Sequence, residues 1–173
     1  LWIIHLQKGG MCSSQSSCDS RCGSSGWAKS SGYGLCGSGN FPSSWKKEGV
    51  FNSEHPYLQH ANKIYVPYCT SDAHWADTEM WGYYMRGKVV VESVIKEAVE
   101  THGLGMNSTH KDTVLFGGSS AGSRGAMAHL DYVHQMLGPQ ASPNVNVYGF
   151  LDSPMWLDRA SLPEHSTDPT TFR

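Results

Sequence analysis

The stretch VLFGGSSAGSRGAM at residues 114–127 constrains the fold more than any other part of the chain. Its first residues are apolar and rich in β-formers, which is typical of a buried strand. Its last residues begin a helical apolar pattern, whose members are Ala126, Leu130, Val133 and Leu137. A glycine-rich turn with two adjacent serines lies between them. The stretch therefore predicts a strand, a tight turn and a helix in direct succession.

Strands and helices alternate along most of the chain. The expected strands are residues 1–7, 63–69, 112–118 and 144–153, and the expected helices begin at Gly87 and at Ala121. Such alternation predicts a parallel sheet with right-handed crossovers, which is an α/β fold in one domain. A Cys-, Gly- and Ser-rich loop over about residues 11–50 and a polar-aromatic loop over 74–87 complete the predicted organisation.

The cysteines indicate an oxidising compartment. Four of the five fall between Cys12 and Cys36, in a segment too polar to form much core, and the fifth is Cys69. Disulfides fit this pattern better than zinc, because the C-x-x-x-C pair of Cys18 and Cys22 has no matching second pair. An odd count leaves one cysteine free or paired outside the chain. A sequon at Asn107 is a candidate glycosylation site and also favours a secreted protein.

Composition and charge exclude several function classes. The formal net charge is −2, and lysines and arginines are scattered, so we expect no nucleic-acid partner. No apolar run approaches the roughly 20 residues that a membrane span needs. We see no cofactor motif and expect neither a cofactor nor a metal ion.

Gly118, Ser120 and Gly122 match the G-x-S-x-G motif of a nucleophile elbow, with a strand before it and a helix after it. In this frame the nucleophile is Ser120. Ser119 would need a glycine where Ala121 stands. The Ala121 amide at the helix start can stabilise an oxyanion. The alternative is a phosphate-binding turn, but the G-x-G-x-x-G and Walker spacings are absent.

An oxyanion hole needs a second donor, which in α/β-hydrolases comes from the loop after an early strand. The first predicted strand runs into Gly9, Gly10 and Met11. The backbone amides of Gly10 and Met11 are therefore the candidates. An ordinary glycine turn is the alternative interpretation.

The base and acid of a triad should follow the nucleophile in the order carboxylate, then histidine. His129 and His134 lie on the helix after the elbow, where surface or packing roles are expected. Asp152 ends a strand, but no further strand carries His165 back to the elbow, so this pair is disfavoured. We expect a loop or surface role for His74 as well.

Five segments, in order, resemble the pectin acetylesterase and Notum family of α/β-hydrolase carboxylesterases. They are KGGMC, CDSR, NKIYVPYCTSDAHWAD, GGSSAGSRGAMAHLD and GFLDSPMWLD. The resemblance implies Ser120 as nucleophile and the Gly10, Met11 and Ala121 amides as oxyanion donors. It implies secretion, a Cys12–Cys69 bridge, a structural Asp152, and an acid and histidine beyond Arg173.

The chain is accordingly expected to be an incomplete α/β-hydrolase domain that lacks N-terminal strands and the acid and histidine segments. As an isolated piece it should be inactive. Its start, LWIIHLQKGG, lacks the pattern of a signal peptide.

The expected function is removal of acetyl-type O-acyl groups from a polysaccharide such as pectin. A Notum-like protein O-palmitoleoyl deacylase and a non-catalytic secreted binding module are the alternatives. Three departures from the family pattern put the acyl specificity in question: Met11 in place of Trp, and Ser123-Arg124 and Pro154 in place of glycines.

Overall fold

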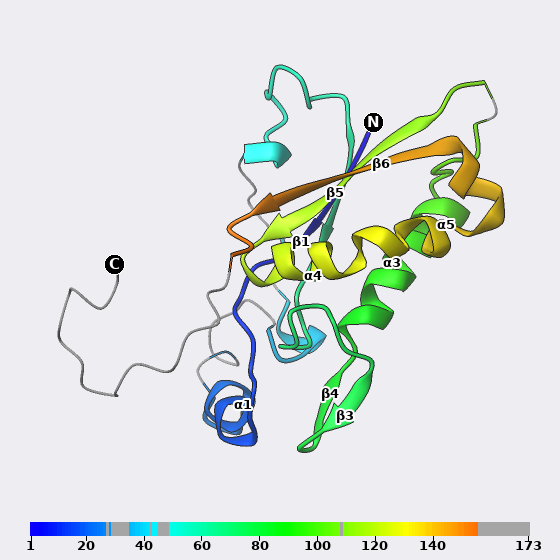
Figure 1. Cartoon of the computed structure of the whole chain (residues 1–173). Helices are drawn as coiled ribbons and strands as arrows, with labels where there is room; N and C mark the ends of the chain where they lie inside the picture. Colours follow the sequence, from blue (N-terminus) through cyan, green and yellow to red (C-terminus); the bar gives the residue numbers. More distant parts are fainter. Residues whose placement is uncertain (27, 29–34, 42, 45–48, 108, 156–173) are drawn as a thin grey trace.

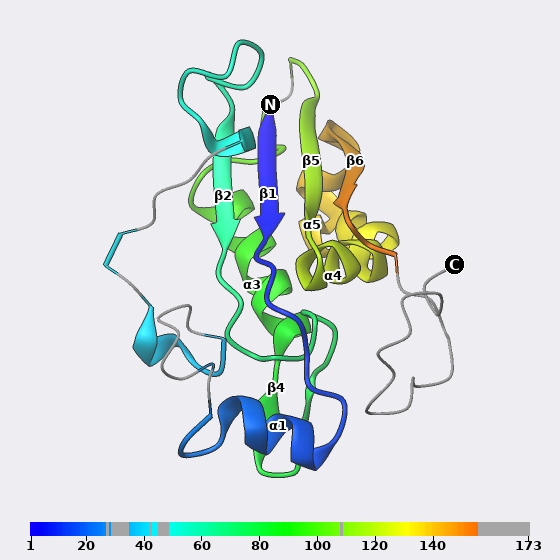
Figure 2. The ribbon, with the colours of Figure 1, turned by 90° about the vertical axis from the view of Figure 1, so that its left-hand side faces the viewer.

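Four parallel strands form the central sheet in the spatial order β2-β1-β5-β6 (Figures 1 and 2). The strands are β1 Trp2–Leu6, β2 Asn62–Val66, β5 Asp112–Ser119 and β6 Val145–Asp152. The structure is a computed structural model, and it describes all residues except 27, 29–34, 42, 45–48, 108 and 156–173. The predicted α/β fold with a parallel sheet is confirmed.

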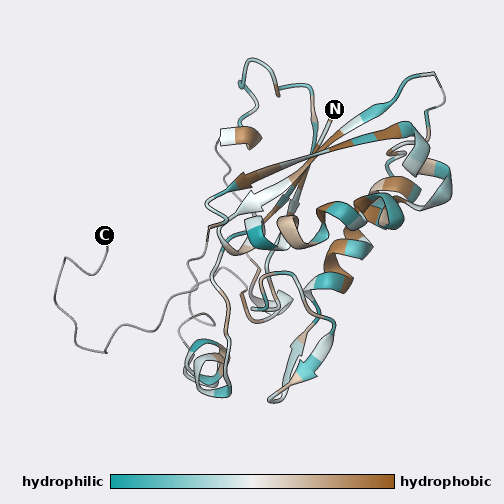
Figure 3. Ribbon diagram, in the orientation of Figure 1, coloured by the Kyte–Doolittle hydropathy of each residue, from teal (hydrophilic) through white to brown (hydrophobic). Residues whose placement is uncertain are grey.

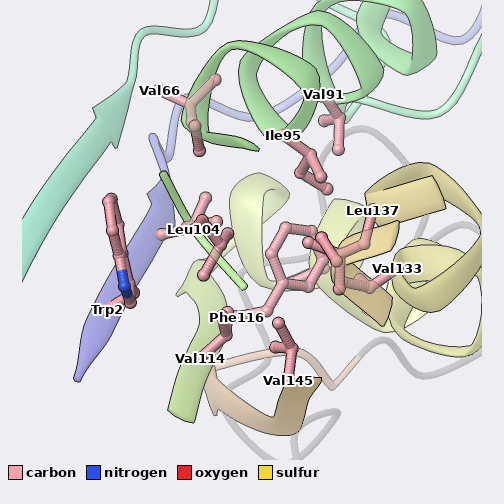
Figure 4. Packing of buried hydrophobic residues seen from close by; sticks show 14 of the residues in the cluster. Trp2, Val66, Val91, Ile95, Leu104, Val114, Phe116, Val133, Leu137 and Val145 are labelled. Atoms are coloured by element: carbon pink, nitrogen blue, oxygen red, sulfur yellow. The ribbon is translucent and has the colours of Figure 1, made fainter. Parts of the chain in front are cut away.

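Helices cover one face of this sheet, and they stand behind it in the view of Figure 2. They are α3 Gly87–Glu100, α4 Ala121–His129 and α5 Val133–Ala141. Figure 3 shows apolar residues along these helices, and the buried ones pack in one cluster with residues of the strands. The core between the two layers contains Val114, Phe116, Ile95 and Val133, each at most 1 % exposed (Figure 4). Burial of this apolar surface is the main stabilising contribution.

Short elements complete the described chain. They are α1 Gln15–Cys22, the hairpin strands β3 Thr78–Met80 and β4 Tyr83–Met85, and the 3₁₀ turns Ser38–Asn40, Gly49–Phe51, Leu130–Tyr132 and Ser142–Asn144. Within the described ranges, no helix combines the length and the apolar character that a membrane crossing requires.

The expected loop over 11–50 contains α1, which composition alone did not indicate. Ser14 caps this helix: its hydroxyl accepts a hydrogen bond from the Ser17 N–H at 3.2 Å, and the Ser17 hydroxyl accepts one from the Ser14 N–H at 2.9 Å. This reciprocal pair satisfies two N–H groups that the first turn leaves open. The serines that suggested a loop therefore serve as a helix start.

Three other segments also differ from what the sequence predicts. β2 ends at Val66, because Pro67 has no N–H to donate to a neighbouring strand. The expected loop at 74–87 forms the antiparallel hairpin β3–β4 around Trp81 and Gly82, whose φ values of 54° and 76° suit a tight turn. The helix after the elbow tightens into a 3₁₀ turn at Leu130–Tyr132.

The sheet register brings the ends of three strands to one edge. Leu6 of β1 pairs with Gly118 of β5, and Ser119 of β5 pairs with Asp152 of β6. The segments that leave these strands therefore start side by side. The segment after β1 contains Gly10, and the segment after β5 starts at Ser120, so the fold itself brings the two together.

Candidate active site

Ser120 lies in a sharp turn between β5 and α4. Its φ of 52° and ψ of −116° fall in a region that side-chain-bearing residues rarely adopt. Its N–H donates a hydrogen bond to the carbonyl oxygen of Asp152 at 2.8 Å, and its own carbonyl accepts one from the Arg124 N–H at 3.1 Å. The surrounding backbone thus holds the strained residue in place.

Steric contacts explain the two glycines that flank this turn. A Cβ on Gly122 would lie 2.0 Å from the carbonyl oxygen of Leu6. A Cβ on Gly118 would lie 2.5 Å from the carbonyl carbon of Gly122 and 2.7 Å from the Leu6 oxygen. All three distances are shorter than a Cβ can approach another atom, so the elbow packs against the end of β1 only with glycine at these two positions.

Ser120 opens into a pocket of about 340 Å³ that contains all four residues singled out for catalysis in the sequence. The lining residues are Gly10, Met11, Ser120, Ala121, Arg124, Ser153 and Met155. The structure thus places both candidate oxyanion segments beside the candidate nucleophile. Gly10 has a φ of 67°, a conformation that favours glycine.

The segment from Gly9 to Cys12, here called the oxyanion loop because it contains two of the candidate oxyanion donors, is anchored at both ends. The Arg21 guanidinium donates a hydrogen bond to the carbonyl oxygen of Gly9 through Nη2. The Cys12 N–H donates to the carbonyl oxygen of Ser71 at 3.0 Å. Between these anchors, Met11 packs on a small buried cluster that includes Ala121. The loop therefore has a defined position relative to the elbow.

Gln7, at the end of β1, connects the sheet to the segment after β2. Its N–H donates to Val66 O at 3.0 Å, and its side-chain oxygen accepts from the Tyr68 N–H at 2.9 Å. Its carbonyl oxygen accepts from His74 Nε2 at 3.1 Å. This acceptor requires a proton on Nε2 and so fixes the tautomer of His74.

His74 lies in a turn, which fits the loop role expected for it, but it is not at the surface: the residue is 1 % exposed. Its ring stacks on Tyr68, with the centroids 4.5 Å apart. Burial lowers the pKa of His74 to about 4, although the Gln7 carbonyl and Asp72 act in the opposite direction. The carbonyl of His74 also accepts a hydrogen bond from His129 Nε2 at 2.6 Å. His129 therefore has the packing role expected for it.

Asp72 organises the turn before α3. Its carboxylate accepts hydrogen bonds from the backbone N–H groups of His74 at 3.0 Å, Ala76 at 3.1 Å and Gly87 at 2.8 Å. A negative charge at the start of a helix is also favourable. Asp72 thus fixes a buried turn that packs against the elbow helix.

A second pocket of about 460 Å³ shares Ser120 and Ser153 with the first. It is lined by His5, Lys8, Tyr65, Ser119, Ser120, Asp152 and Ser153. Hydrogen bonds from the hydroxyls of Ser119 and Ser153 lower the pKa of the exposed Asp152 carboxyl. The other half of the disfavoured pair, His165, lies outside the described residues.

The disulfides differ from the expected pairing. Cys12 bonds to Cys18, Cys22 bonds to Cys36, and Cys69 is free. The Cys12–Cys69 bridge is therefore wrong: α1 begins soon after Cys12 and brings Cys18 within 5.0 Å, Cα to Cα, which is ordinary disulfide geometry. Burial raises the pKa of the half-buried Cys69 thiol.

The sequence analysis also predicted a glycosylation site at Asn107 and no metal ion. Asn107 is exposed, and its side-chain oxygen accepts hydrogen bonds from the N–H and the hydroxyl of Thr109 at 2.8 and 2.7 Å. Ser108 lies outside the described residues, and glycosylation of Asn107 stays a prediction. Over the described ranges, no group of three or more His, Cys, Asp or Glu could hold a metal ion.

The sequence did not single out the polar residues behind the oxyanion loop. Arg21 and Ser71 are both buried, 4 % and 3 % exposed, and the Arg21 Nε donates to the Ser71 hydroxyl at 2.7 Å. Two signals were available: Arg21 is a charged residue inside a cluster of cysteines, and it ends the family-like segment CDSR. Its contact with Ser71 joins residues that are far apart in sequence.

Comparisons with known proteins agree with this architecture. The Pectinacetylesterase family model matches residues 1–173. The palmitoleoyl-protein carboxylesterase notum2 of Xenopus laevis is 32 % identical over 91 % of this chain and 31 % of its own length. The human protein NOTUM is 29 % identical over 91 % of this chain and 30 % of its own. The chain thus spans about a third of these relatives.

A solved structure gives the same result. The Wnt deacylase Notum from Drosophila superposes with a TM-score of 0.77 and 29 % identity, over 98 % of this chain and 48 % of that chain. Sequence and fold therefore agree over most of the chain, and the chain belongs to the pectinacetylesterase family.

Proposed function

We propose that the protein is a serine carboxylesterase that removes O-acyl groups, with acetyl groups on a polysaccharide such as pectin as its first substrate class. One observation carries the proposal: Ser120 has the strained backbone of a nucleophile elbow, in one pocket with Gly10, Met11 and Ala121. An exposed serine hydroxyl beside the backbone N–H groups of a helix start and of a neighbouring loop is suited to acyl transfer.

In the proposed reaction, the Ser120 Oγ attacks the ester carbonyl and loses its proton to a general base. The carbonyl oxygen becomes an oxyanion, which the N–H groups of Gly10, Met11 and Ala121 stabilise. Collapse of this intermediate expels the alcohol, which takes a proton from the base, and leaves an acyl-enzyme. Water then attacks the acyl-enzyme by the same route and releases the carboxylic acid.

We assign the base and its carboxylate partner to residues outside those described. His5 lines the neighbouring pocket, but its ring is packed among aromatic rings. Its centroid lies 5.6 Å from Phe51, 5.8 Å from Tyr65 and 5.7 Å from Phe150. A proton shuttle needs a ring that faces the nucleophile and an acid behind it.

Charge near Ser120 supports an acidic polysaccharide as substrate. Arg124 lines the pocket that holds the candidate oxyanion amides. Lys8 lines the neighbouring pocket together with the exposed Asp152 carboxylate, which offsets its charge. The cationic Arg124 in the pocket of the nucleophile favours a substrate with negative charge near the ester. Family membership supports the same substrate class.

A second candidate is a long-chain protein deacylase, the activity named for the similar Xenopus and human proteins. A further pocket of about 340 Å³ shares Arg124 and Met155 with the Ser120 pocket, and its other lining residues are Trp75, Met127 and Pro154. These mostly apolar walls suit an acyl chain that extends away from the nucleophile.

Secretion is part of the proposal. Two disulfides within the described chain, Cys12–Cys18 and Cys22–Cys36, are stable in an oxidising compartment and rare in the cytosol.

The test uses the full-length protein and a fluorophosphonate probe. Labelling should occur at Ser120, be lost in Ser120→Ala and persist in the matched variant Ser119→Ala. Hydrolysis of p-nitrophenyl acetate, octanoate and palmitate then separates the two substrate classes: a preference for acetate supports the acetylesterase, and a preference for palmitate supports the deacylase. A folded protein that neither labels nor hydrolyses any of these esters is a binding module, and the proposal fails.

A further inference from the structure

Arg21 is a buried cation that the mechanism above does not use. It lies in α1 between Cys18 and Cys22 and is 4 % exposed. Burial lowers the pKa of its guanidinium, but an arginine stays charged at any physiological pH. A buried charge is costly unless it is well paired, so the groups that accept hydrogen bonds from Arg21 indicate its role.

These partners hold both ends of the oxyanion loop. One guanidinium nitrogen donates to Gly9 O, and another donates to the Ser71 hydroxyl at 2.7 Å. Ser71 in turn accepts the Cys12 N–H on its carbonyl at 3.0 Å. The Ser71 hydroxyl in turn donates a hydrogen bond to Leu35 O at 2.6 Å, so it acts as both acceptor and donor in this chain of contacts.

The contact with Gly9 has a geometric consequence for Gly10. A trans peptide is planar, and its C=O and N–H point in opposite directions. When Arg21 holds the Gly9 oxygen on one side of the loop, the Gly10 N–H is turned to the other side. A cation on the carbonyl also polarises the peptide and makes its N–H a stronger donor.

We propose that Arg21 is a positioning residue for the oxyanion hole: its hydrogen bond to Gly9 O aims and polarises the Gly10 N–H toward the developing oxyanion. This inference rests on the proposed esterase function and adds a residue to its machinery. Arg21 does not touch the substrate and acts through one peptide group.

The disulfides make this arrangement rigid. Cys12–Cys18 joins the end of the oxyanion loop to the middle of α1, one turn before Arg21. Cys22–Cys36 fixes the end of α1, and its sulfurs lie 3.4 and 3.7 Å from the Ser71 hydroxyl. In Figure 2, α1 lies beyond the carboxyl ends of the strands.

The experiment compares Arg21→Met and Arg21→Lys in the full-length protein. Removing one oxyanion donor outright costs about 10²–10³ in kcat, so misaiming it should lower kcat by about tenfold or more in Arg21→Met. KM should change by less than about twofold, and the affinity for phenylboronic acid, which forms a tetrahedral adduct on the serine, should fall in parallel with kcat. Arg21→Lys should recover part of kcat, because one ammonium keeps the charge but lacks the fork that reaches both acceptors.

The matched control is Arg86→Met, which removes an exposed arginine paired with Asp77 and should leave kcat and boronate affinity unchanged. An Arg21→Met protein that folds and keeps the wild-type kcat overturns the inference. If Arg21→Met does not fold, Arg21→Lys decides: a several-fold lower kcat at constant KM supports the inference, and a wild-type kcat overturns it. A wild-type protein without esterase activity overturns both this inference and the proposed function.

Discussion

The Cα of Gly122 packs so closely on Leu6 that a Cβ would lie 2.0 Å from the Leu6 carbonyl oxygen. This contact connects the start of the elbow helix to the end of the strand that carries the oxyanion loop. The distance between Ser120 and this loop is therefore set by backbone packing.

Gly122→Ala should accordingly destabilise the fold by about 3 kcal/mol, since the added methyl displaces either the helix or the strand. The measurement is urea unfolding of the full-length protein. Gly39→Ala is the control, because nothing lies within 4 Å of a Cβ at Gly39, and it should change stability by less than about 0.5 kcal/mol. Equal stability of both variants would contradict the packing argument.

Stability should fall as the pH is lowered from about 6.5 to about 4, because His74 has a pKa of about 4 in the fold and its ordinary value of 6.5 when unfolded. In this window the unfolded chain binds a proton that the folded chain does not. The His74 contribution to the free energy of unfolding is therefore fully present above pH 6.5 and is lost by about pH 4. It is at most about 3 kcal/mol.

The check is the pH dependence of the unfolding free energy in wild type, His74→Gln and the exposed-residue control His102→Gln. The slope between pH 4 and 6.5 should be smaller in His74→Gln and unchanged in the control. A slope that His74→Gln leaves intact would assign the effect to other groups.

Asp72→Ala should cost about 3 kcal/mol, because three backbone N–H groups, of His74, Ala76 and Gly87, lose their acceptor. Asp131→Ala removes an exposed carboxylate and should be nearly neutral. Denaturant midpoints give both values. A small effect at Asp72 would mean that water replaces the carboxylate in this turn.

The two disulfides should contribute according to the length of the loops they close. Replacing Cys22 and Cys36 by serine should cost about 3 kcal/mol, and replacing Cys12 and Cys18 about 2 kcal/mol, since they are 14 and 6 residues apart. Alkylation of the unreduced, denatured protein followed by peptide mapping should modify Cys69 and spare the other four. Modification of Cys12 would refute the observed pairing.

Most of the fold could be predicted from local patterns in the sequence. The parallel sheet and its helices followed from apolar periodicity, and the glycine spacing at 118 and 122 indicated the elbow, because each signal is set by neighbouring residues. The Cys12–Cys18 pairing and the burial of His74 could not be found this way. The first depends on α1 turning back on the loop, and the second on a turn that docks against Gly125, where a Cβ would lie 2.6 Å from Ala73 O.

The register of β1 against β5 also has a consequence for the order of folding. Gly10 and Ser120 meet only after a segment of roughly 110 residues has closed, and such distant parallel pairing is slow compared with helix formation. During refolding, the amides of α3 should gain protection from exchange before Ser120 can react with a fluorophosphonate. Reactivity at Ser120 thus marks the completion of the sheet.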